Sequence, residues 1–182
     1  NRSVASLCSN GGMLTSELTD DGKLKVQHRL APFFDPIDTP IFEHPVIYEG
    51  IAYFPDFHGL VHAIDVSGSQ AKYMNNWSML SDADKSGNWR PSGLVLNDVD
   101  DAGNMYIIFQ PDGAEGTQTH GGTQVRVYNL KSRKLVRTID TPNWAISVAV
   151  TRGENPHLIV TSGNLNLDVF NANTGEFLQT VD

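Results

Sequence analysis

The sequence predicts an all-β fold, and two observations lead to that prediction. Short runs of β-branched, aromatic and aliphatic residues, each closed by Gly, Asn or Asp, follow one another along the 182 residues. In addition, the stretch VYNLKSRKLVRTID at 127–140 returns 42 residues later as VFNANTGEFLQTVD at 169–182. A content of 40% hydrophobic and 19% charged residues is typical of a folded domain with a substantial core.

Each apolar run predicts one strand, and the polar residues between runs predict hairpin turns. The turns fall at Gly, Asn and Asp clusters such as 9–12, 20–23, 100–103 and 173–176. The expected strands are 4–8, 13–18, 24–28, 46–48, 51–54, 60–65, 71–74, 93–96, 105–110, 125–130, 135–139, 144–150, 157–161, 165–170 and 177–181.

The duplicated stretch is interpreted as the last hairpin of two successive four-stranded units. Identical pairs recur at the offset of 42, and residues 63–68 form a weaker echo of the same hairpin. A period of about 40 to 50 residues with four strands per unit is typical of β-propeller blades. We place four units at about 1–30, 45–75, 93–140 and 144–182. Four blades are the lower limit for a closed ring, so we expect about half of a larger propeller.

Charge and apolar patterning exclude two classes of partner. Thirteen Lys and Arg against 21 Asp and Glu give a net charge of -8, which would repel nucleic acid. The apolar runs, such as 105–109, are far shorter than the roughly 20 residues that span a bilayer. We therefore expect neither a nucleic-acid partner nor a membrane partner.

The N-terminal residues and the single cysteine carry limited information. The chain begins with Asn1 and shows no signal-peptide pattern, so we interpret it as a mature piece. Cys8 allows no internal disulfide, and it is expected either as a small buried residue or as a partner for a cysteine elsewhere.

Two stretches resemble metal sites. The sequence Asp82-Ala83-Asp84-Lys85-Ser86-Gly87 starts like a calcium loop, but Gly93 stands where the bidentate Glu should be, so a solvated loop is favoured. His58 and His62 have the spacing of a zinc motif, but they lie on a predicted turn and strand, and the central Glu is missing.

Other candidate residues have structural interpretations of equal or greater weight. The residues 97–101 suit a turn, and the Gly-rich segment 111–122 predicts a long rim loop that either binds a partner or is simply solvent-exposed. Trp77, Trp89 and Trp144 are expected as packed core aromatics. Ser92 has no nucleophile-elbow context, and no catalytic triad is recognisable. The residues by themselves indicate a scaffold or binding subunit with no catalytic residue.

Several stretches resemble the heavy subunit of the tryptophan tryptophylquinone amine dehydrogenases. They are Tyr53 to Asp65, Trp89-Arg90-Pro91-Ser92-Gly93 and the hairpin turn Asn173-Thr174-Gly175-Glu176, and the similarity runs in order along nearly the whole chain. Trp89 to Gly93 is the most specific element. The chain is more similar to the aromatic amine dehydrogenases than to the methylamine dehydrogenases.

The resemblance implies a seven-bladed propeller of which this chain is the C-terminal half. It also implies a periplasmic enzyme of two heavy and two light subunits, which deaminates primary aromatic amines and passes electrons to azurin, a blue copper protein. The quinone is made from two tryptophans of the cysteine-rich light subunit. Because this chain has only Cys8, it cannot be that subunit, and its tryptophans are expected to be unmodified.

Two further interpretations stay open. A stand-alone propeller that binds proteins without catalysis fits the lack of a catalytic set, although WD-type dipeptides are missing. A propeller enzyme that holds pyrroloquinoline quinone is less favoured, because no cluster of Glu, Asn and Asp is recognisable. The aromatic residue that reaches toward substrate in the amine dehydrogenases is expected in the N-terminal half, so no catalytic residue is transferred to this chain.

Overall fold

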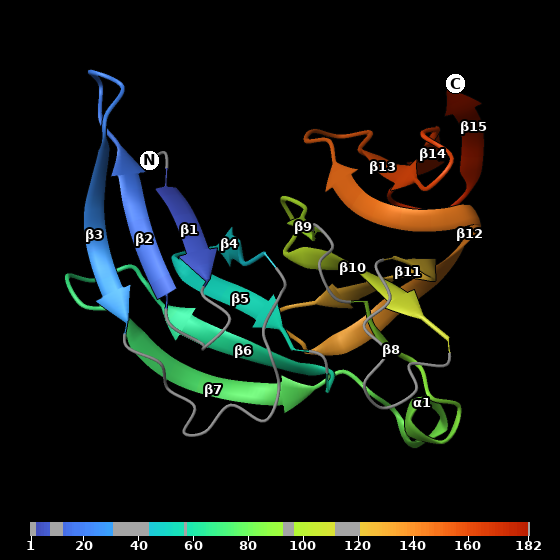
Figure 1. The fold of residues 1–182 in the computed structure, drawn as a ribbon, viewed down its shortest axis with the longest axis horizontal. Coiled ribbons are helices and arrows are strands. Elements are labelled where there is room, and N and C mark those ends of the chain that lie inside the picture. Colours follow the sequence, from blue (N-terminus) through green and yellow to red (C-terminus); the bar gives the residue numbers. More distant parts are fainter. Residues whose placement is uncertain are drawn as a thin grey trace.

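A computed structural model describes residues 3–7, 13–30, 44–56, 58–92, 97–111 and 121–181. These residues form fifteen strands and one short helix, and all strand pairs are antiparallel. The all-β prediction is therefore confirmed, and the sheets form an arc consistent with part of a β-propeller (Figure 1). None of the described residues forms a helix able to cross a membrane.

We number four blades in chain order. Blade 1 contains β1 (Ser3–Leu7), β2 (Met13–Leu18) and β3 (Leu24–Leu30), and blade 2 contains β4 (Val46–Tyr48), β5 (Ile51–Pro55), β6 (Leu60–Asp65) and β7 (Lys72–Ser78). Blade 3 contains β8 (Arg90–Pro91), β9 (Asp98–Val99), β10 (Asn104–Gln110), β11 (Gly122–Asn129) and the first half of β12 (Lys134–Val150). Blade 4 contains the second half of β12, then β13 (His157–Ser162), β14 (Leu167–Asn171) and β15 (Phe177–Val181).

The long strand β12 belongs to two blades, which corrects the expectation of separate strands at 135–139 and 144–150. Its first half pairs with β11 continuously as far as Asp140 and again at Ala145, opposite Gly122, and its second half pairs with β13 from Ala145 onward. The backbone stays extended through 141–143, so blades 3 and 4 share one eight-stranded sheet. Figure 1 shows β12 curving from one blade into the next.

The inner edge of blade 3 is built from two short strands. β8 pairs with the end of β10 at Phe109, and β9 pairs with its beginning at Met105. The strand expected at 93–96 lies between them, outside the described residues. The strand expected at 165–170 begins at Leu167 instead, because Leu165 adopts a left-handed turn conformation with φ 68°.

The core consists of layers between neighbouring blades. Along β10, Met105, Ile107 and Phe109 join the hydrophobic cluster shared with blade 2, whereas Tyr106 and Ile108 join the cluster shared with blade 4. This alternation follows from the two-residue period of a strand, which sends successive side chains to opposite faces. Blade 3 is thus buried on both faces, as expected of an interior propeller blade.

A glycine marks a close approach of blades 2 and 3. Gly103 adopts φ 76°, and a Cβ atom there would lie 2.7 Å from the ring of Tyr48. The turn between β9 and β10 therefore requires glycine at this position for two reasons: the backbone has a positive φ, and a side chain would collide with Tyr48 of blade 2.

Candidate functional site

Buried polar residues occupy one equivalent position in blades 2, 3 and 4. His62, Arg126 and Asp168 lie on β6, β11 and β14, the strand next to the outermost strand of each blade, with exposed fractions of 0%, 6% and 0%. Arg126 and Asp168 are 42 residues apart, at matching positions of the sequence repeat. Burying a charged or polar group is costly unless it is paired, so the partners of these residues define what the position does.

Arg126 binds the segment that connects blades 2 and 3. Its Nη1 atom donates a hydrogen bond of 2.7 Å to Asp84 Oδ1, and its Nε atom donates one of 3.2 Å to Gln124 Oε1. The guanidinium also lies 4.2 Å from the ring centroid of Phe109 and 5.1 Å from that of Trp89. Asp84 and Trp89 belong to the segment 79–89 that connects β7 to β8, which we call the crossover between blades 2 and 3. Because Arg126 belongs to β11, this cluster attaches the crossover to blade 3.

The crossover contains helix α1 (Asp82–Ser86), where the sequence favoured a solvated loop. The Ser81 side chain accepts a 3.1 Å hydrogen bond from the Asp84 amide, and the Ser81 amide donates one of 2.9 Å to Asp84 Oδ2, which is a capping box. Asp82 is solvent-exposed and lies 3.6 Å from Lys85. The calcium-like spacing therefore produces a capped helix, whose Asp84 carboxylate is occupied by protein donors.

These contacts set the ionisation of Asp84. Burial alone would raise the pKa of its carboxyl, but hydrogen bonds from Ser81 and the neighbouring Arg126 hold the pKa below the ordinary value of 3.8. The negative charge of Asp84 is therefore maintained in the folded protein at neutral pH.

This pKa predicts a pH dependence of stability. A lowered folded-state pKa stabilises the fold above 3.8, and that contribution is lost as the pH falls through the folded-state pKa. We expect the urea midpoint to fall more steeply from about pH 5 to about pH 3 in the parent chain than in an Asp84→Asn variant. Unfolding is followed by tryptophan fluorescence. If the urea midpoint changes equally with pH in the two chains, the proposed role of the Asp84 carboxylate is wrong.

Asp168 makes similar contacts between β14 and the part of β12 that connects blade 3 to blade 4. It accepts hydrogen bonds of 2.6 Å from Thr180 Oγ1 and 3.1 Å from Asn143 Nδ2. Asn143 lies in the middle of β12, where the chain passes from blade 3 to blade 4. Arg126 and Asp168 carry opposite charges, but they have the same role. Arg126 links β11 to the crossover before blade 3, and Asp168 links β14 to the part of β12 that passes from blade 3 into blade 4.

His62 is a core histidine rather than one of a pair of zinc ligands. Its Nε2 atom lies 2.9 Å from Asp56 Oδ2, its Nδ1 atom lies 3.4 Å from the Tyr73 hydroxyl, and its ring stacks on Phe54 at 5.1 Å. His58 is exposed on the preceding turn. Nowhere among the described residues does a group of three or more His, Cys, Asp or Glu side chains form a possible metal site.

The three tryptophans have separate environments. Trp77 and Trp89 are partly buried against the cluster between blades 2 and 3, as predicted, whereas Trp144 is 40% exposed. The expectation of a core position for Trp144 is wrong, because the next residue of β12, Ala145, takes the buried position and the alternation of the strand leaves Trp144 on the other face, where its ring lies beside Gly121. Trp77 contacts Tyr128, and Trp89 contacts Arg126, so the described contacts pair no tryptophan with another. The chain does not fit a cofactor made from two joined tryptophans.

Ser92 has a structural role in this fold. The residue is fully buried, and its Oγ atom accepts a 2.7 Å hydrogen bond from the amide of Gly121. This bond joins the inner edge of blade 3 to the end of the predicted rim loop. Residues 112–120 of that loop, and Cys8, lie outside the described residues.

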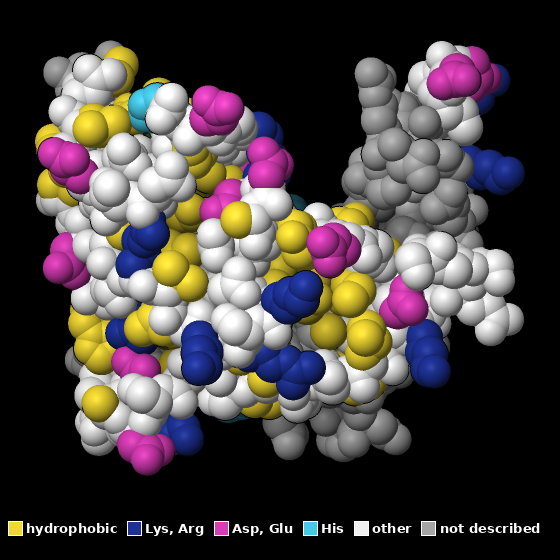
Figure 2. All heavy atoms as spheres, turned by 180° about the vertical axis from the view of Figure 1, so that it is seen from behind, with side chains coloured by type: hydrophobic (Ala, Val, Ile, Leu, Met, Phe, Trp, Pro, Cys, Tyr) yellow, Lys and Arg dark blue, Asp and Glu magenta, His cyan; other side chains and the backbone are white. Residues whose placement is uncertain are grey.

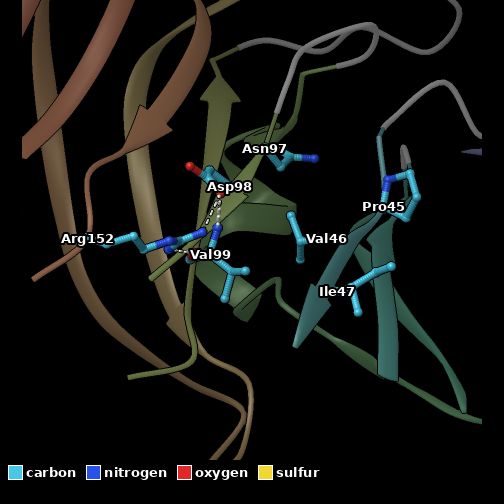
Figure 3. Close-up of a pocket in the computed structure, with 7 residues that line it drawn as sticks. All are labelled: Pro45, Val46, Ile47, Asn97, Asp98, Val99 and Arg152. Atoms are coloured by element: carbon cyan, nitrogen blue, oxygen red, sulfur yellow. Dashed lines mark hydrogen bonds and ion pairs between the residues drawn. The ribbon is translucent and has the colours of Figure 1, made fainter. Parts of the chain in front are cut away.

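A small pocket opens between the inner strands of blades 2 and 3 (Figure 3). Its volume is about 290 Å³, and its apolar side includes Val46 and Ile47 of β4. On the other side, Arg152 donates to the carbonyl of Val99 and lies 3.5 Å from Asp98 and 3.7 Å from Asp101. The seven lining residues include no Ser, Cys, Lys, His or Tyr, and the one lining carboxylate, Asp98, is paired with Arg152. The pocket therefore lacks a nucleophile activated by a base.

Asp98 also joins blade 3 to blade 4. Its Oδ2 atom accepts a 2.7 Å hydrogen bond from the amide of Val150 at the end of β12. The sequence placed 97–101 in a turn, whereas Asp98 and Val99 form β9 and the turn begins after them.

Sequence reasoning also missed Arg126 and Asp168. The available signal was a charged residue at an inward position of a buried strand, repeated at the offset of 42.

These observations define a class of protein: a propeller segment whose buried polar residues hold blades and crossovers together. The model of the methylamine dehydrogenase heavy chain family matches residues 1–182, and the chain belongs to this family. The methylamine dehydrogenase heavy chain of Methylobacillus flagellatus is 25% identical over 185 residues, covering 100% of this chain and 46% of its own length. That of Methylorubrum extorquens is 23% identical, with 96% and 43% covered, and that of Paracoccus versutus is 22% identical, with 96% and 41% covered. The chain thus spans less than half the length of these relatives.

Proposed function

We propose that this chain forms part of the heavy subunit of a periplasmic quinoprotein. The enzyme would oxidise primary aromatic amines to aldehyde and ammonia and pass the electrons to an azurin-type copper protein. The observation that carries this proposal is the family match over all 182 residues. Two heavy and two light subunits would form the assembly, and the light subunit would carry the tryptophan tryptophylquinone that accepts the electrons of the amine.

The role of this chain in that enzyme is structural. Arg126, Asp168 and His62, the buried polar groups at the repeated position, have protein partners that hold the blades in place. In the pocket between blades 2 and 3, the one lining carboxylate, Asp98, is bonded to Arg152 and to the amide of Val150, and none of the lining residues is a nucleophile. We therefore assign no catalytic residue to this chain and place the chemistry on the light subunit.

The preferred amine has two candidates. The resemblance of Trp89 to Gly93 to the aromatic amine dehydrogenases supports an aromatic substrate. The names of the relatives, which are methylamine dehydrogenase heavy chains, favour methylamine as the second candidate.

Exposed apolar residues on the outer face of blade 4 are evidence for a larger ring. Leu167 is 39% exposed, although Val125, the residue 42 positions earlier in the repeat, is fully buried in the cluster between blades 3 and 4. Figure 2, viewed from behind, shows hydrophobic side chains over the part of the molecule where blade 4 lies, at the left of the view. We propose that another blade of the same heavy subunit covers this face, within a seven-bladed ring.

Purification of the complete heavy chain with its light subunit tests the function. We expect a visible quinone absorbance that bleaches on adding tryptamine, and amine-dependent reduction of azurin. A faster reaction with methylamine would favour the second candidate. A colourless complex that is inert to both amines would contradict the enzyme and favour a stand-alone propeller that binds proteins.

A further inference from the structure

The turn between β11 and β12 carries a cluster of exposed cations, which we call the basic turn. It consists of Lys131, Arg133 and Lys134, and all three side chains are exposed. None of the three forms an ion pair with a carboxylate among the described residues. Other cations of this acidic chain are each paired with an aspartate, namely Lys23, Lys85, Arg126 and Arg152.

The sequence repeat shows that the turn does not need these charges in order to form. In blade 3 the Arg133 amide donates a 2.7 Å hydrogen bond to the carbonyl of Asn129, and in blade 4 the Gly175 amide donates one of 2.7 Å to the carbonyl of Asn171. The side chain of the same asparagine accepts a further backbone hydrogen bond in both turns. The blade 4 turn has this geometry without a cation, because the residues at the positions of the basic turn are Asn173, Gly175 and Glu176.

The backbone of Arg133 makes an arginine unfavourable at its position. Arg133 adopts φ 59°, and Gly175, its equivalent in the repeat, adopts φ 81°. Glycine accepts this left-handed conformation readily, whereas a residue with a Cβ atom does not. An exposed arginine that is present despite its backbone preference indicates a function for the side chain.

Protection of a strand edge does not account for the basic turn. Cations on edge strands prevent unwanted pairing, but only Lys134 lies on β12, and Lys131 and Arg133 precede the strand. The next two residues, Leu135 and Val136, have exposed fractions of 49% and 45%. Cations beside exposed apolar side chains are a combination that protein interfaces use.

We propose that the basic turn, together with Leu135 and Val136, is a docking surface for an acidic segment of a partner protein. Carboxylates of that segment face the three cations, and an apolar side chain between them covers Leu135 and Val136. Nucleic acid or an anionic membrane would also face the rest of a chain with net charge -8 and be repelled by it. A short segment meets only the basic turn, because charges beyond about 8 Å are screened at physiological ionic strength. This surface is additional to the proposed enzyme function and does not depend on it.

The test measures binding of a fluorescent peptide, Glu-Glu-Leu-Glu-Glu, to the complete heavy chain by anisotropy. The variant Lys131→Asn/Arg133→Gly/Lys134→Glu carries the residues of the blade 4 turn, so its backbone is expected to be unchanged. Arg137 is kept, since it donates to the carbonyl of Ala172. We expect the dissociation constant to rise at least about tenfold in the variant, and binding by the parent to weaken as salt is added.

A matched variant separates the local charge from the net charge. Lys23→Asn/Lys25→Gln/Lys72→Glu makes the same change in net charge at exposed positions of blades 1 and 2, and it should bind the peptide as the parent does. Arg133→Gly alone should weaken binding while leaving the thermal unfolding midpoint unchanged or raised, because it removes the unfavourable φ. A purely structural arginine would instead lower the midpoint.

Four results would overturn the proposal. They are a parent chain that does not bind the acidic peptide, equal binding by the triple variant of the basic turn, equal binding of a Gln-Gln-Leu-Gln-Gln peptide, and tighter binding of a DNA oligonucleotide or of phosphatidylserine vesicles. Repeating the titration with the heavy chain in complex with its light subunit distinguishes two sources of the acidic segment. Loss of peptide binding there identifies the light subunit as the partner, and retained binding identifies a separate protein. Amine oxidation is not measured, so the outcome is independent of the proposed function.

Discussion

Replacing Arg126 by methionine should lower the free energy of unfolding by about 3 to 5 kcal/mol, the range for breaking a buried ion pair. Methionine fills much of the space beside Phe109 and Trp89 but leaves the Asp84 carboxylate without its cation. The side chains of Arg126 and Asp84 are only 8% and 13% exposed, so water replaces the lost partner poorly. Urea unfolding at neutral pH, followed by circular dichroism, measures the effect.

A double-mutant cycle distinguishes the ion pair from simple packing. Asp84→Ala alone removes the carboxylate and part of the capping box, and the double variant Arg126→Met/Asp84→Ala no longer buries an unpaired charge. We expect the double variant to be less destabilised than the sum of the two single variants. Additive effects, or a loss below about 1 kcal/mol for Arg126→Met, would show that the pair contributes little.

Replacing Gly122 by alanine should destabilise the chain by about 3 kcal/mol or more, because the new methyl group meets backbone atoms. A Cβ atom at Gly122 would lie against the carbonyl oxygen of Phe109, 2.6 Å from the carbonyl carbon of that residue and 2.9 Å from Ile108 Cγ2. The backbone of β10 cannot move aside without disturbing its pairing with β8 and β11. The thermal unfolding midpoint should fall accordingly.

Gly163→Ala provides the matched control. The nearest atom to a Cβ there is Ile146 Cδ1 at 3.8 Å, an ordinary van der Waals distance, and Gly163 does not adopt a positive φ. We expect a change within about 1 kcal/mol in either direction. Similar losses for Gly122→Ala and Gly163→Ala would indicate that the packing at β11 is looser than described.

Local pattern determined most of the strands. Residues 105–110 form an apolar run closed by turn residues, and the structure places β10 there with six of its seven residues buried. Pattern did not predict helix α1, because the capping box of Ser81 and Asp84 is stabilised in addition by Arg126, which is 42 residues away from Asp84. A contact so distant in the chain leaves no trace in local periodicity.

The candidate site was less predictable than the fold. The repeat made Arg126 and Asp168 equivalent in sequence, but an arginine and an aspartate share no chemistry that marks a common role. Their shared role becomes visible only when Asp84 and Asn143 are seen in successive crossovers, each beside the strand that carries the buried charge. The pocket containing Arg152 was likewise unpredicted, because three blades contribute to it.

The sequence by itself determined that this protein is built from repeated antiparallel strands, because strand period, turn residues and the offset of 42 are all local properties of the chain. Only the tertiary structure decided that β12 runs without interruption from blade 3 into blade 4, and that buried charges hold the crossovers. Both outcomes depend on contacts between blades. Such contacts join residues far apart in the chain, where packing and desolvation, rather than local preference, select the conformation.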